Sequence, residues 1–63
     1  MSVEVAEFYR SKQSPGILLR VLELSDDRII VEVYAPYKLR TWYYMDDFCS
    51  FFRKLSSLEK ELL

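Results

Sequence analysis

The sequence predicts an α+β domain, in which a small antiparallel sheet of three to four strands in a meander is followed by one C-terminal amphipathic α-helix. Short runs of branched aliphatic and aromatic residues alternate with turn residues, as in strands joined by hairpins. The last third of the chain instead repeats its apolar residues at helical spacing. With 63 residues, the chain forms one domain, residues 1–63.

The first strand is assigned to residues 3–10. Val3 and Val5 flank Glu4 in the alternation that is typical of a strand, and the turn residues that follow suit a hairpin. A short helix capped by Ser2 is the alternative for this segment, and the sequence leaves it open.

The next two strands are expected over residues 17–24 and 28–35. Both segments are rich in branched aliphatic residues, and both are bounded by turn residues. Because the connection at residues 25–27 is so short, the two strands form an antiparallel hairpin.

The register of this hairpin follows from its charges. A three-residue loop sets Arg20 opposite Glu32 and Val21 opposite Val31, and both pairings are favourable. A two-residue loop mismatches these residues. We therefore expect the three-residue loop, with Asp27 in the left-handed conformation that such loops require.

Residues 38–45 are assigned as a fourth strand because aromatic residues and threonine favour strands. The alternative extends the following helix back to Lys38, which would place Asp46 and Asp47 in a helix interior. In the strand, alternate side chains share one face. On that face lie Lys38, Arg40, Trp42 and Tyr44.

The helix is expected over residues 46–62, where an apolar stripe recurs at helical spacing. Asp46 or Asp47 would supply the N-cap oxygen, with a negative charge that favours the helix N-terminus. The stripe consists of Phe48, Phe51, Phe52, Leu55, Leu58 and Leu62.

The composition excludes most catalytic chemistry. The chain has no histidine, which is the usual general base and the commonest metal ligand. It has one cysteine and one glycine, too few for a cysteine zinc site or a glycine-rich phosphate loop. We expect a protein that is not an enzyme, with no catalytic residue, cofactor or metal.

Three remaining polar features have ordinary structural interpretations. Asp26 and Asp27 are turn residues, and Asp46 and Asp47 cap a helix, rather than forming cation sites. Cys49 is a small apolar residue of the helical stripe.

No apolar run approaches the about 20 residues of a membrane span, and the N-terminus lacks the pattern of a signal peptide. We therefore expect a cytoplasmic protein that does not enter the membrane.

The absence of Asn and His together with 30% charged residues follows the compositional trend of thermophilic proteins.

The predicted hairpin has two apolar faces, and one helix can cover only one of them. We therefore expect a small non-enzymatic interaction or adaptor module that forms a homodimer or binds another protein. Two geometries stay open, face to face or by pairing of edge strands. The residues expected at this interface are Leu18, Leu22, Leu24, Ile30, Tyr34, Trp42 and Tyr44.

A nucleic-acid-binding module is the alternative hypothesis. Aromatic and basic residues alternate over residues 38–44, as on platforms that stack single-stranded bases. Against it stands the net charge of -1, since phosphate binding usually requires a basic excess. The residues expected to bind nucleic acid are Lys38, Arg40, Trp42 and Tyr44.

Overall fold

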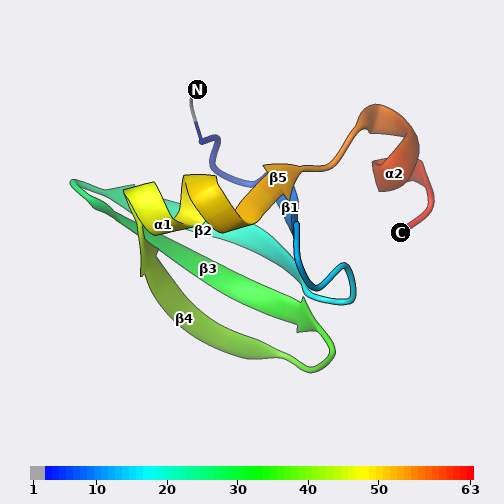
Figure 1. Ribbon diagram of the computed structural model, residues 1–63, viewed down its shortest axis with the longest axis horizontal. Coiled ribbons are helices and arrows are strands. Elements are labelled where there is room, and N and C mark those ends of the chain that lie inside the picture. Colours follow the sequence, from blue (N-terminus) through cyan, green and yellow to red (C-terminus); the bar gives the residue numbers. More distant parts are fainter. Residues whose placement is uncertain (1–2) are drawn as a thin grey trace.

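The computed structural model describes residues 3–63 and confirms the α+β class, with a five-stranded antiparallel sheet and two short helices (Figure 1). The sheet thus has more strands than the three to four expected. In chain order the elements are β1 (Phe8–Ser11), β2 (Leu18–Ser25), β3 (Arg28–Ala35), β4 (Leu39–Tyr44), α1 (Met45–Phe51), β5 (Phe52–Lys54) and α2 (Ser57–Glu61).

The strand order is β4-β3-β2-β1-β5, so the first four strands form a meander and the last strand returns to pair with the first. All neighbours are antiparallel. This order leaves β4 and β5 as the two edges of the sheet. Figure 1 shows α1 on one face of the sheet. In the chain, α1 follows β4 and precedes β5.

The hairpin of β2 and β3 confirms the expected pairing of Arg20 with Glu32 and of Val21 with Val31. The three-residue loop is wrong, because Ser25 pairs with Arg28 and only two residues form the turn. A bulge at Leu22 supplies the missing residue and reconciles the two registers.

The left-handed residue of this turn is Asp26, with φ of 47°, and not Asp27 as expected. A two-residue turn whose twist matches the flanking strands needs positive φ at its first position, and aspartate tolerates that conformation better than most residues.

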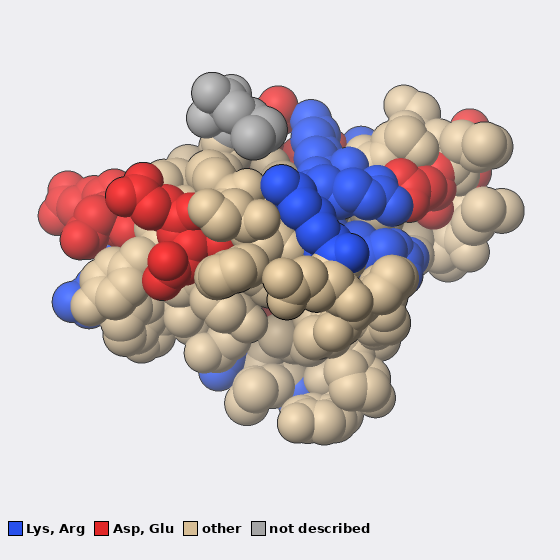
Figure 2. All heavy atoms as spheres, viewed as in Figure 1, with Lys and Arg blue, Asp and Glu red and all other residues tan. Residues whose placement is uncertain are grey.

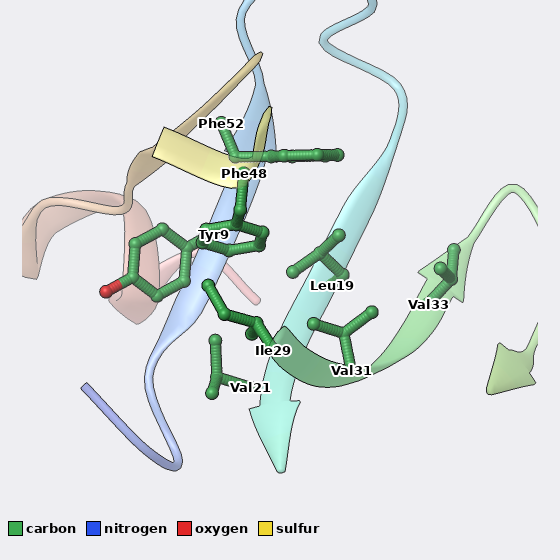
Figure 3. Close-up of a cluster of buried hydrophobic side chains, with 8 residues drawn as sticks. All are labelled: Tyr9, Leu19, Val21, Ile29, Val31, Val33, Phe48 and Phe52. Atoms are coloured by element: carbon green, nitrogen blue, oxygen red, sulfur yellow. The ribbon is translucent and has the colours of Figure 1, made fainter. Parts of the chain in front are cut away.

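The core lies on one face of the sheet (Figure 3). The side chains that the hairpin turns toward this face are fully buried. They are Leu19, Val21, Ile29 and Val31, each with 0% exposure. These residues belong to the face that alternation in the sequence marks as almost wholly apolar.

Aromatic rings cover this aliphatic layer. The Phe48 ring from α1 is 1% exposed and lies 5.0 Å from the ring of Tyr9, edge to face. It also stacks on Phe52 at 5.0 Å, and Tyr43 lies 5.1 Å from Phe52. The core is therefore closed by residues from β1, β4, α1 and β5 together.

The single helix over residues 46–62 is wrong. The structure ends α1 at Phe51 and continues as β5, which pairs with β1. Two further backbone bonds extend this pairing, from Lys12 N to Phe51 O at 2.8 Å and from Leu55 N to Phe8 O at 3.0 Å. The unpaired edge of β1 supplies hydrogen-bond partners, and this tertiary pairing overrides the helical spacing.

The expected N-cap at Asp46 or Asp47 is also wrong. Both residues lie in the first turn of α1, and the N-cap is Tyr44, which makes no side-chain cap bond. Instead, Met45 N donates to Asp27 O at 2.7 Å and ties the start of α1 to the β2–β3 turn. The negative charges of these two carboxylates still stabilise α1, because they lie at the positive end of the helix dipole.

The segment before β1 is neither the strand of residues 3–10 nor a short helix. The strand begins only at Phe8, after a turn in which Ala6 has φ of 72°. Ala6 N donates to Val21 O at 2.8 Å and holds the turn against β2.

Neither helix of the described residues is long and apolar enough to cross a membrane.

Candidate functional site

One face of the sheet lies opposite the core, and we call it the outer face. Strand alternation assigns its residues, since Ile29 and Val31 point into the core. Cross-strand pairing then aligns the outer residues of β3 with those of β4. The aligned pairs are Arg28 with Tyr44, Ile30 with Trp42, and Glu32 with Arg40.

Trp42 and Tyr44 are exposed aromatic residues of the outer face. Their side chains are 45% and 47% exposed, and their rings meet edge to face at 5.0 Å. The guanidinium carbon of Arg28 lies 4.6 Å from the Trp42 ring centroid and 5.9 Å from that of Tyr44. One cation thus rests on two rings, an arrangement that holds all three side chains in place.

A second aromatic group lies at the other end of the outer face. The rings of Phe8 and Tyr34 are 5.7 Å apart, although they come from β1 and β3. Arg20 covers Phe8 at 5.5 Å, and Lys38 lies 5.9 Å from the Tyr34 ring. Arg20 also donates from Nε to the Ala6 carbonyl at 3.0 Å, which fixes its position.

The structure brings most of the expected interface residues together. On the outer face, the exposed rings of β4 border a half-buried layer from β2 and β3. This layer consists of Leu18, Leu22, Ile30 and Tyr34. Leu24 lies apart, because the bulge at Leu22 moves it into register with the core residue Ile29.

The four residues expected to bind nucleic acid are only partly aligned. Arg40, Trp42 and Tyr44 share one row of β4, but Lys38 precedes the strand and lies against Tyr34. Sequence reasoning missed Phe8 and Arg28 as members of the outer face. Alternation within β3 was the signal for Arg28, but its contact with Trp42 depends on the register between two strands.

The charged residues of the molecule separate by location. Figure 2 shows acidic side chains gathered where the β2–β3 turn meets α1, and basic side chains over β1 and β5. Each of the four ion pairs of residues 3–63 includes a residue of β5 or α2. The cations Arg20, Arg28, Lys38 and Arg40 make no carboxylate pair among the described residues.

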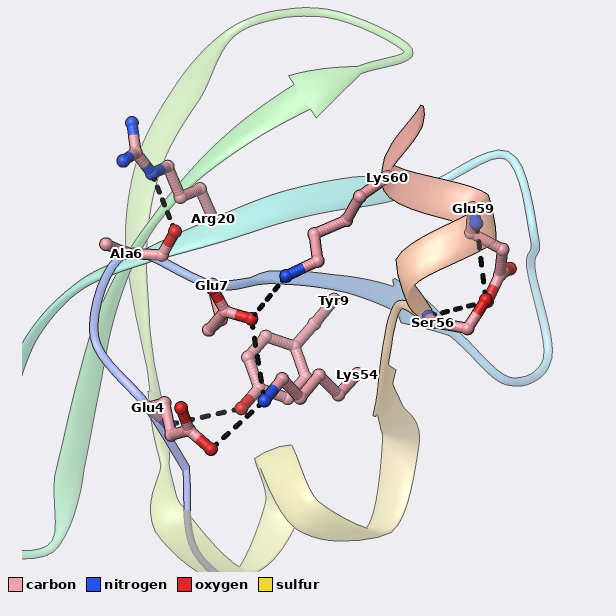
Figure 4. Close-up of polar contacts among 9 residues, drawn as sticks. All are labelled: Glu4, Ala6, Glu7, Tyr9, Arg20, Lys54, Ser56, Glu59 and Lys60. Carbon is pink, nitrogen blue, oxygen red and sulfur yellow. Dashed lines mark hydrogen bonds and ion pairs between the residues drawn. The ribbon is translucent and has the colours of Figure 1, made fainter. Parts of the chain in front are cut away.

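The ion pairs have a structural role (Figure 4). Lys54 bridges Glu4 at 3.0 Å and Glu7 at 3.4 Å, and Lys60 reaches Glu7 at 2.8 Å. The hydrogen bond from Lys60 lowers the pKa of the Glu7 carboxyl below its usual value. These contacts link the segment before β1 to β5 and α2.

Glu59 is the centre of a second polar group. The two terminal guanidinium nitrogens of Arg53, Nη1 and Nη2, donate to its carboxylate at 2.8 and 2.7 Å. Ser56 forms a reciprocal capping box with it at the start of α2. The Arg53 hydrogen bonds, with the Ser56 backbone donor, lower the pKa of Glu59 to about 2.

The acidic end holds a shallow hollow of about 160 Å³, lined by Asp27, Tyr44, Met45 and Asp46. No group of three or more ligating side chains is found among the described residues 3–63. Cys49 is a free thiol, half-buried in α1.

Comparison of the chain with protein-family models, curated proteins and solved structures finds no match.

Proposed function

We propose that this protein is a small, non-enzymatic interaction module that self-associates as a homodimer through its outer face. One observation carries the proposal. Trp42 and Tyr44 stand nearly half exposed on an edge strand, with Arg28 across both rings. Trp, Tyr and Arg are the residue types that contribute most to binding energy at protein interfaces.

The layer beneath these rings supports the same function. Leu18, Leu22 and Ile30 are half-buried, whereas Phe48 of α1 and Phe52 of β5 pack into the core on the opposite face. A second protein surface on the outer face would bury these residues further, and a chain of 63 residues gains stability from such burial. The free Cys49 thiol fits the reducing conditions of the cytoplasm, where we place the protein.

Sedimentation equilibrium over a range of protein concentrations tests the proposal. The wild type is expected to shift from 7.6 kDa to twice that mass as concentration rises. Trp42→Ala is expected to weaken association by roughly 30-fold or more, the effect of losing about 2 kcal/mol at a hot spot.

Phe51→Ala is the matched control, because Phe51 is 47% exposed but lies on α1, away from the outer face. It should associate like the wild type. A wild type that stays monomeric at every concentration would contradict the proposal. Equal weakening of association by Trp42→Ala and Phe51→Ala would contradict it as well.

A nucleic-acid-binding function is the second candidate. It is favoured by four cations that make no carboxylate pair among residues 3–63, namely Arg20, Arg28, Lys38 and Arg40. It predicts that a single-stranded oligonucleotide quenches Trp42 fluorescence at low salt, with affinity falling steeply as salt rises. Unchanged fluorescence at low salt would exclude stacking on this ring, which Arg28 already contacts at 4.6 Å.

A further inference from the structure

The two edges of the sheet differ in how open they are to another strand. β5 has three residues, two of them the cations Arg53 and Lys54. β4 has six residues, Leu39–Tyr44, with Arg40 as its one charged residue and no proline, and only β3 pairs with it among the described residues. Long edges with few protective residues pair readily with other strands.

We propose that β4 pairs antiparallel with β4 of a second copy, about a two-fold axis perpendicular to the sheet at Trp42. The two sheets then form one continuous sheet, and the outer faces of both copies lie side by side. This inference rests on the proposed self-association and assigns it to edge pairing rather than face-to-face contact. Trp42 and Tyr44 of the outer face then lie at the contact, while the half-buried residues of β2 and β3 stay outside it.

Strand geometry restricts the possible registers. A two-fold axis perpendicular to the sheet keeps each face on its own side, so outer residues of one copy can oppose only outer residues of the other. The axis must therefore pass through a residue. The central candidates on β4 are Thr41, Trp42 and Tyr43.

The axis at Trp42 keeps Arg40 to Tyr44 of both copies paired within the strand. It sets Arg40 opposite Tyr44 of the second copy, twice by symmetry. It also brings the two Trp42 rings, each 45% exposed, against one another. Aromatic pairs and cation–aromatic pairs across strands are favourable, and no like charges face each other in this register.

The two neighbouring registers fit less well. An axis at Tyr43 pairs only Trp42 to Tyr44 within the strand, because α1 begins at Met45. An axis at Thr41 sets Arg40 opposite Trp42 of the second copy, so the two exposed Trp42 rings do not oppose each other.

Pairwise cysteine trapping tests the register, with Cys49→Ser as the background so that no native thiol competes. Arg40→Cys and Tyr44→Cys are prepared separately, mixed and oxidised. The mixture is expected to give a disulfide-linked dimer, because these positions oppose each other across the two-fold axis. Each variant alone should give no disulfide-linked dimer, since its own two cysteines lie four residues, roughly 13 Å, apart along the strand.

Two trapping results would overturn the inference. Self-linked dimers from Thr41→Cys would place the axis one residue away, and a mixture that dimerises without cross-linking would exclude this register. A wild type that remains monomeric in sedimentation would instead remove the proposed function itself. Assemblies larger than a dimer would indicate head-to-tail pairing of β4 with β5, and they too would overturn the two-fold arrangement.

Amide hydrogen exchange on the unmodified chain gives an independent measurement. Backbone amides of β4 that point away from β3 are expected to exchange more slowly as protein concentration rises, whereas amides at the β5 edge should not change. If the protein dimerises while β4 exchange stays independent of concentration, the pairing of β4 edges is wrong.

Discussion

Arg28 and Trp42 lie against each other on neighbouring strands, with the guanidinium carbon 4.6 Å from the ring centroid. The contact is diagonal, since Arg28 pairs with Tyr44, and Trp42 lies two residues before Tyr44 on β4. It fixes an exposed ring of the sheet edge before any partner binds. A ring held in place loses less conformational entropy on association.

Removal of the cation tests this contact. Arg28→Met is expected to lower the free energy of unfolding by about 0.5–1 kcal/mol, the value for exposed cation–π pairs. Arg28→Lys keeps the charge and should lose less. Urea unfolding followed by the fluorescence of Trp42, the only tryptophan, measures both. An unchanged midpoint for Arg28→Met would show that the contact contributes nothing to stability.

The aromatic part of the core is expected to be essential for folding. Phe48→Ala removes a ring that is 1% exposed and contacts Tyr9 and Phe52, so it should cost about 3–5 kcal/mol. Phe51→Ala, on the exposed side of the same helix, should cost about 0.5 kcal/mol or less. Thermal unfolding by circular dichroism compares the two, and equal losses would contradict the assigned core.

The paired carboxylate of Glu59 should make stability depend on pH. Its pKa falls from an ordinary 4.5 to about 2 in the folded chain, so its contribution is present above pH 4.5 and is lost as pH falls toward 2. Glu59→Gln should therefore be less stable than the wild type at neutral pH, and the difference should shrink over this window. Urea midpoints at several pH values measure it, and a constant difference would contradict the role of the Arg53 pair.

The turn before β1 offers a stabilising substitution. Ala6 has φ of 72°, a conformation that costs an L-residue about 1–2 kcal/mol and costs glycine little beyond chain entropy. Ala6→Gly is expected to raise the free energy of unfolding by up to about 1 kcal/mol. Ala35→Gly, within β3, should lower it by about 0.5–1 kcal/mol. Chemical denaturation measures both, and a loss for Ala6→Gly would show that the turn has another conformation in solution.

Local patterns were enough to predict the central hairpin. Arg20 and Glu32 carry opposite charges between apolar neighbours, so they indicated their own pairing, which the structure has. The same alternation identified Arg40, Trp42 and Tyr44 as one row on β4. These features depend on neighbours in sequence or on one short turn, and so they can be derived without the rest of the fold.

The sequence by itself determined the α+β class, the central pairing of β2 with β3 and the two faces of that hairpin. Tertiary structure alone decided that Phe52 leaves the helix, because a helical stripe also fits a strand once the free edge of β1 is present to pair with it. It also decided the bulge at Leu22 and the contact of Arg28 with Trp42. Each of these depends on the register between strands, which is set by packing of the whole sheet rather than by any one segment.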